Sequence, residues 1–141
     1  MDPILVSACL LGKNCKYNGG SNLCPRLVEY LQDKAYIPVC PEVAAGMPTP
    51  RTPIEICGGE ILDKNGVSWD SALRQAVEDI LEQLQDRKID CAILQSRSPT
   101  CGVNQIYDGS FSGRLIPGSG VLAQALIEAG YRVMDVEDFR G

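Results

Sequence analysis

Short apolar segments alternate with helical segments along the chain, and this alternation limits the fold more than any other feature. Strands are predicted at residues 4–9, 36–40, 91–95 and 131–136, which are apolar and too short for helices. Helices are predicted at residues 22–34, 72–84 and 121–129, where apolar residues recur at helical spacing. Such alternation favours parallel sheets with right-handed crossovers. The sequence therefore predicts an α/β protein, a single-domain three-layer sandwich over residues 1–141 with a mostly parallel, Rossmann-like sheet.

Proline and glycine refine this prediction. Pro38 indicates that the strand at residues 36–40 lies at an edge of the sheet or that it begins there. Residues 41–59 and 108–120 are predicted loops, because the first stretch is rich in Pro and Gly and the second in Gly. Asn65-Gly66 is a turn signal, consistent with a small hairpin or a strand-to-helix connection. Asn22 is the candidate N-cap of the first helix.

The chain has no histidine and seven cysteines. The lack of histidine excludes Ser-His-Asp and Cys-His catalysis and histidine metal ligation. An odd cysteine count without a basic and apolar leader predicts a reducing, cytoplasmic location and no disulfide framework. With a net charge of -5 and no apolar run near the length of a membrane span, neither nucleic acid nor membrane is an expected partner. The sequence specifies no oligomeric state.

Cysteine lies at or beyond the carboxyl end of three predicted strands. These residues are Cys9, Cys40 and Cys101. Ligands of open α/β sheets bind outside the carboxyl ends of the strands, so the three thiols are expected in one crevice. The alternative is that each is a small buried apolar residue, which is the interpretation favoured for Cys57 and Cys91. Cys15 follows the first strand in a polar loop and is expected to line the same crevice, the alternative being a spare thiol.

Two further side chains are candidates for acid–base chemistry. Glu42 follows Cys40 by two residues, where a buried carboxylate could act as a general base. The alternative is that Glu42 caps a loop or pairs with Arg51. The Ser98 hydroxyl could bind substrate or relay a proton, although Ser-Pro is also common in turns. The Gly118-Ser-Gly120 helix start could offer backbone amides to an anion.

Several separated runs resemble the thiouracil desulfidase family. They are LVSACLLG (residues 5–12), CKYNGG (15–20), PVCPEVAAGMPTPR (38–51), SRSPTCG (96–102) and QIYDGSFSGRLIPGSGV (105–121). The resemblance implies a cytoplasmic enzyme that hydrolyses the thiocarbonyl of a thiolated pyrimidine and releases sulfide without net redox change. It also implies a 4Fe-4S cluster with three cysteine ligands and one open iron. Lys16 and Asn18 stand where Arg and Asp are expected, a difference that bears on substrate preference.

The matching motif positions assign a role to five residues. The cluster ligands are Cys9, Cys40 and Cys101, and the acid–base residues are Glu42 and Ser98. The alternatives are a zinc module, held by the same three cysteines with Cys15, and a metal-free sulfur or persulfide carrier.

Overall fold

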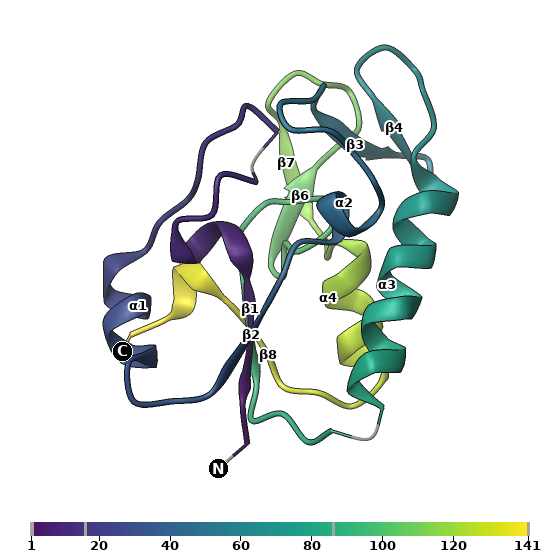
Figure 1. The fold of residues 1–141 in the computed structure, drawn as a ribbon. Coiled ribbons are helices and arrows are strands. Elements are labelled where there is room, and N and C mark those ends of the chain that lie inside the picture. The colour runs from purple at the N-terminus through teal and green to yellow at the C-terminus, as the bar shows by residue number, and fades with distance from the viewer. Residues whose placement is uncertain (1, 16, 86, 141) are drawn as a thin grey trace.

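A sheet of four parallel strands forms the centre of the molecule (Figure 1). The computed structural model describes residues 2–15, 17–85 and 87–140, so Lys16 lies outside the described residues. The strands are β1 (Ile4–Ser7), β2 (Tyr36–Val39), β5 (Ala92–Leu94) and β8 (Val133–Asp135). Their order is β2-β1-β5-β8, and each pairing is parallel. The predicted α/β class with a parallel sheet is confirmed.

The strand order reverses between β1 and β5. The chain adds β2 on one side of β1, then returns to add β5 and β8 on the other side. In open parallel sheets, such a reversal leaves a crevice at the carboxyl ends of the two strands where it occurs. Of the two alternatives that Pro38 left open, the structure shows the edge position, because β2 is the first strand in the order and begins two residues before Pro38.

Helices cover both faces of the sheet, because successive side chains of a strand point to opposite faces. Ile4 and Val6 of β1 pack on the side of α1, whereas Leu5 packs on the side of α3 and α4. Figure 1 shows this arrangement, with α1 on one side of the strands and α3 and α4 on the other. The helices are α1 (Pro25–Leu31), α3 (Asp70–Leu84) and α4 (Val121–Glu128).

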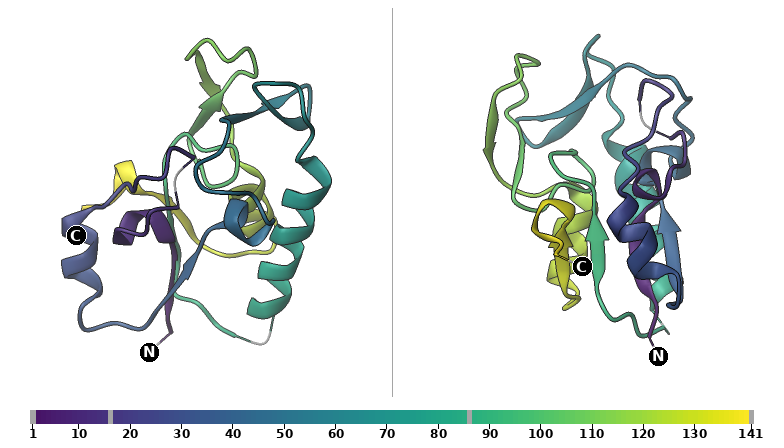
Figure 2. Two further views of the ribbon diagram at one scale, coloured as in Figure 1. Left: turned by 45° about the horizontal axis from the view of Figure 1, so that its top comes forward. Right: turned by 90° about the vertical axis from the view of Figure 1, so that its left-hand side faces the viewer.

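Two small antiparallel hairpins stand beyond the carboxyl ends of the sheet (Figure 2). They consist of β3 (Ile54–Cys57) with β4 (Glu60–Asp63), and β6 (Gln105–Tyr107) with β7 (Leu115–Pro117). A short helix, α2 (Pro41–Ala44), follows β2 directly. The loop predictions for residues 41–59 and 108–120 are therefore wrong in part, since α2 and β3 lie in the first stretch and β7 in the second. Elements of three or four residues depend on their packing partners more than on local propensity.

The predicted ends of two elements also need correction. The strand predicted at residues 4–9 ends at Ser7, and Ala8–Leu11 form a 3-10 helix, η1, that contains Cys9. Gly12 stops η1 in the left-handed conformation, with φ of 92°. The first helix begins at Pro25 with Cys24 as its N-cap, so Asn22 is not the cap. Within the described residues, no helix has the length and apolar character needed to cross a membrane.

Candidate functional site

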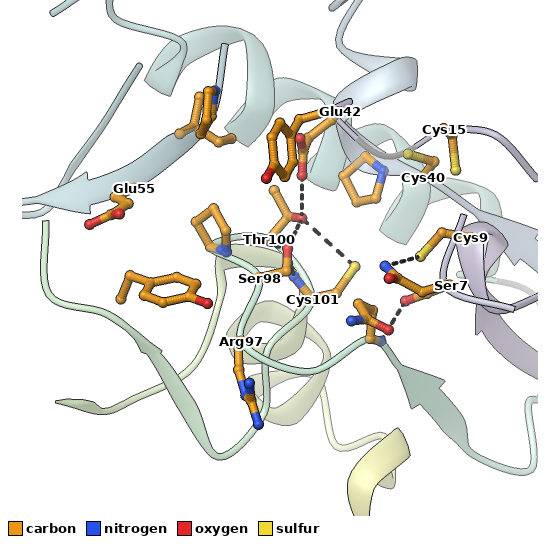
Figure 3. Close-up of a pocket in the computed structure, with 18 of the residues that line it drawn as sticks. Ser7, Cys9, Cys15, Cys40, Glu42, Glu55, Arg97, Ser98, Thr100 and Cys101 are labelled. Atoms are coloured by element: carbon orange, nitrogen blue, oxygen red, sulfur yellow. Dashed lines mark hydrogen bonds between the residues drawn. The ribbon is translucent and has the colours of Figure 1, made fainter. Parts of the chain in front are cut away.

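A pocket of about 530 Å³ lies at the carboxyl ends of β1, β2 and β5. Its lining includes all five residues that the sequence singled out: Cys9, Cys40, Glu42, Ser98 and Cys101. Figure 3 shows the cysteines at one end of the pocket and Glu55 at the opposite end. Glu42, Ser98 and Thr100 lie between them. The strand-end argument therefore placed Cys9, Cys40 and Cys101 in the right region.

The three thiols come from three different segments. Cys9 lies in η1, and Cys40 is the N-cap of α2, directly after β2. Cys101 is buried in the loop between β5 and β6. Burial raises the pKa of Cys40 to about 11 and that of Cys101 to about 12. The pKa of Cys9 is raised by burial and also by the neighbouring charge of Cys40.

The protonated thiols bear directly on metal binding. Because their pKa values lie above the ordinary value, the thiols carry protons at neutral pH when no metal is present. A metal ion binds thiolates, so loading this site releases protons.

Cys15 is a fourth thiol in the pocket. Burial raises its pKa. The expectation that Cys15 lines the crevice is confirmed. Cys57 and Cys91 are not among the described residues that line the pocket. The Cys57 thiol instead donates a hydrogen bond to the carbonyl of Gly109, at 3.2 Å.

The Glu42 carboxylate has a different partner on each oxygen. Arg51 approaches Oε1 through Nη2 at 2.9 Å and through Nε at 3.0 Å. Thr100 donates its hydroxyl hydrogen to Oε2 at 3.2 Å. The side chains of Arg51 and Glu42 are 4% and 15% exposed, so this is a largely buried ion pair. The pairing with Arg51 that was an alternative for Glu42 is present, and Glu42 still faces the pocket.

Ser98 organises the loop that carries Cys101. Its Oγ accepts hydrogen bonds from the backbone amides of Thr100 and Cys101, both at 3.1 Å. The same oxygen lies 2.8 Å from Oγ1 of Thr100. Ser98 is therefore a turn residue and a pocket residue at once. Thr100 is a pocket residue that sequence reasoning missed, and its position between two candidates in SRSPTCG was the available signal.

The start of α4 holds this loop in place and does not offer its amides to an anion. Val121 donates its backbone amide to the carbonyl of Pro99 at 2.9 Å, and Leu122 donates to that of Thr100 at 2.8 Å. Gly120 donates to the carbonyl of Gly102 at 2.7 Å. The amides of Gly120, Val121 and Leu122 are thus taken up by loop carbonyls, so Gly118-Ser-Gly120 is an ordinary helix start and not the anion site that was its alternative.

Fold and site together define an α/β protein with a thiol-rich pocket at the carboxyl edge of a parallel sheet. A sequence model of the 2-thiouracil desulfurase family matches residues 4–138. The chain belongs to this family.

Two individual proteins are similar over nearly the whole chain. An uncharacterized protein of Bacillus subtilis (strain 168), YbbK, is 36% identical, and the match covers 93% of each chain. The solved structure of TudS, a [4Fe-4S]-dependent thiouracil desulfidase, superposes with a TM-score of 0.92 at 32% identity. That match covers 99% of this chain and 93% of the TudS chain. The fold is therefore shared with TudS almost from end to end.

Proposed function

We propose that this protein removes sulfur from a thiolated pyrimidine such as thiouracil by hydrolysis, with a 4Fe-4S cluster held by Cys9, Cys40 and Cys101. The observation that carries the proposal is the presence of these three thiols and the Glu42 carboxylate in one pocket. Membership of the 2-thiouracil desulfurase family supports the reaction. The similarity to TudS, which is [4Fe-4S]-dependent, supports the cofactor.

The donor set fits an iron–sulfur cluster. Cysteine thiolates are the usual ligands of such clusters. Within the described ranges, no three Cys, Asp or Glu side chains converge at the distances of a single ion. Cluster ligands bind different iron atoms, so they lie farther apart than the ligands of one ion. With three protein ligands, the cluster supplies one open iron that acts as a Lewis acid toward the soft thiocarbonyl sulfur.

The residues around the cysteines supply the acid–base chemistry. The hydrogen bonds from Arg51 and Thr100 hold the Glu42 carboxylate at the pocket, where it takes a proton from the attacking water. The Ser98 hydroxyl orients the ring or delivers a proton to it. The reaction consumes water, puts its oxygen on the carbon that loses sulfur and releases sulfide. No electrons are gained or lost, so no external reductant or oxidant takes part.

Anaerobic reconstitution tests the proposal. The chain is loaded with iron and sulfide, and iron and acid-labile sulfide are then measured per chain. The loaded protein is assayed for sulfide release from 2-thiouracil and from 4-thiouracil. We expect bound iron with acid-labile sulfide, and turnover of at least one compound. Bound zinc without sulfide would support the zinc module, and cluster uptake without turnover would refute the proposed substrates.

Single substitutions to serine test the ligands. Cys9→Ser, Cys40→Ser and Cys101→Ser should each take up much less iron and lose activity, because each removes one thiolate from the cluster. Cys91→Ser is the matched control, since Cys91 is not among the described residues of the pocket, and it should load as the unmodified chain does. A sulfur carrier would lose function at only one or two of the three positions. Retention of the full cluster by any of the three variants would contradict the assignment.

A further inference from the structure

We infer that Thr100 is a positioning residue whose hydroxyl links the Glu42 carboxylate to the Ser98 hydroxyl. The inference rests on the proposed function, in which Glu42 and Ser98 handle protons at the pocket. These hydrogen bonds join two segments that are far apart in sequence, because Glu42 lies in α2 and Ser98 in the loop that follows β5. Figure 3 shows the three side chains in a row, joined by hydrogen bonds.

The hydrogen-bond chemistry fixes the direction of this row. Oγ1 of Thr100 lies 3.8 Å from Sγ of Cys101 and 3.2 Å from Oε2 of Glu42. Because the Glu42 carboxylate is ion-paired with Arg51 and accepts only, the shorter contact takes the hydroxyl hydrogen of Thr100. The contact between the Ser98 and Thr100 hydroxyls, at 2.8 Å, then requires Ser98 to be the donor. The two lone pairs of Ser98 Oγ already accept the backbone amides of Thr100 and Cys101. The hydrogen of Ser98 therefore points to Thr100, which fixes the orientation of the Ser98 hydroxyl.

Thr100 is held rigidly at this point of the loop. Thr100 is 1% exposed, and its backbone carbonyl accepts a hydrogen bond from the amide of Leu122 at 2.8 Å. A Cβ on Gly120 would lie 2.5 Å from the carbonyl carbon of Thr100, so α4 packs directly against it. This packing and the backbone hydrogen bond leave the hydroxyl little freedom to move. A side chain can position two partners only if it is itself held in place.

The consequence for the reaction is that Thr100 fixes the positions of both partners. Its hydroxyl donates to Oε2 of Glu42 and accepts from Ser98, so the carboxylate and the serine oxygen are held at set places on the pocket wall. Loss of this hydroxyl should therefore misplace both groups relative to the substrate.

The test compares Thr100→Val, which has nearly the same shape without a hydroxyl, with Thr100→Ser, which keeps the hydroxyl. Both are assayed as cluster-loaded protein, and iron is measured per chain. We expect Thr100→Val to lower kcat about 10- to 100-fold, the usual effect of removing a supporting hydrogen bond at a site. KM should not change, because Thr100 acts on the chemistry and not on binding. Thr100→Ser should restore most of kcat, and Thr52→Val, outside the pocket lining, should match the unmodified chain.

A double substitution separates a link from a merely structural role. In the Glu42→Gln background, Thr100→Val should lower kcat no further, because the partner through which Thr100 acts is already changed. Normal kcat in fully loaded Thr100→Val would overturn the inference. Equal impairment of loaded Thr100→Ser and Thr100→Val would also overturn it, because the hydroxyl would then be irrelevant.

A measurement on the metal-free chain distinguishes failure of this inference from failure of the proposed function. The thermal midpoints of Thr100→Val, Glu42→Gln and the double variant are compared with that of the unmodified chain. Non-additive shifts support the link even if no thiolated pyrimidine is turned over. Additive shifts refute the link whether or not the protein is a desulfidase.

Discussion

At the level of single residues, Glu42 shows that a carboxylate can pair with an arginine and still line a pocket. Sequence reasoning treated a pairing with Arg51 and a role in the pocket as alternatives. In the structure, Arg51 binds Oε1, while Oε2 accepts from Thr100 at the pocket. Neither partner is close to Glu42 in sequence: Arg51 is nine positions away and Thr100 fifty-eight. The sequence can therefore indicate that Glu42 is a candidate, but only the folded structure shows which side chains bind its two oxygens.

Asp63 provides a pH-dependent prediction at the same scale. Burial raises the pKa of this carboxyl, but hydrogen bonds from the amides of Val67 and Asn65 and from Trp69 Nε1 outweigh it, and the pKa falls below 3.8. A lowered pKa in the folded state stabilises the fold above the unfolded value, and that contribution disappears as pH falls through the folded value. Asp63→Asn should therefore lower the thermal midpoint at neutral pH, and its deficit should shrink as the pH falls below 3.8.

The control for Asp63 is Asp79→Asn, on the exposed face of α3. It should change the midpoint little at any pH, since its hydrogen bond to Gln75 lies at the surface. A deficit of Asp63→Asn that stays constant across the acidic range would contradict the assignment of a lowered pKa.

At the level of elements, the position of Cys101 depends on how closely α4 approaches the loop before it. A Cβ on Gly120 would lie 2.5 Å from the carbonyl carbon of Thr100 and 2.8 Å from the amide nitrogen of Cys101. No side chain fits there, although Gly120 has an ordinary φ of -70°. Glycine is needed here for space and not for backbone conformation.

Gly120→Ala should therefore move the loop, lower the thermal midpoint and reduce the iron retained after reconstitution. Gly130→Ala is the matched control, because its φ is +91° and nothing lies within 4 Å of the added Cβ. Gly130→Ala should lower the free energy of unfolding by about 1–2 kcal/mol through backbone strain alone, and the variant should retain its iron. Full iron content in Gly120→Ala would show that the loop tolerates the displacement and that Cys101 does not depend on it.

The elements also show which local patterns are informative. The helix predicted at residues 72–84 is observed as Asp70–Leu84, because a long apolar stripe is specified by many residues at once. The apolar pattern in the second strand of each hairpin is weaker than the stripe of this helix. β7 has only three residues and pairs with β6, and the tip between them is held by the Glu55 carboxylate, which accepts the amides of Gly109 and Phe111. That partner lies more than fifty positions away, so no local window contains it.

For the whole molecule, one central sheet joins two apolar clusters on opposite faces. Leu27 lies in the cluster beneath α1, and Leu122 lies in the cluster beneath α3 and α4. Both residues are 0% exposed. The strands between the clusters contribute side chains to both, so the two faces should unfold together.

Leu27→Ala and Leu122→Ala should each lower the free energy of unfolding by about 2–5 kcal/mol. The free energy of unfolding is measured by urea unfolding of the metal-free chain, followed by circular dichroism and by Trp69 fluorescence. The two probes should give one coincident transition in each variant. Leu23→Ala is the control, since Leu23 is 54% exposed, and it should change stability by less than about 0.5 kcal/mol. Two separate transitions would contradict the joint unfolding of the two faces.

The sequence by itself determined the α/β class and the gathering of Cys9, Cys40 and Cys101 near one crevice. These features follow from periodicity and from the rule that parallel strands end at a common edge, both of which act along the chain. Only the tertiary structure decided that Cys9 lies in a 3-10 helix, that both hairpins form, and that Thr100 connects Glu42 with Ser98. Those features depend on hydrogen bonds and packing between segments far apart in sequence, and such contacts exist only once the chain has folded.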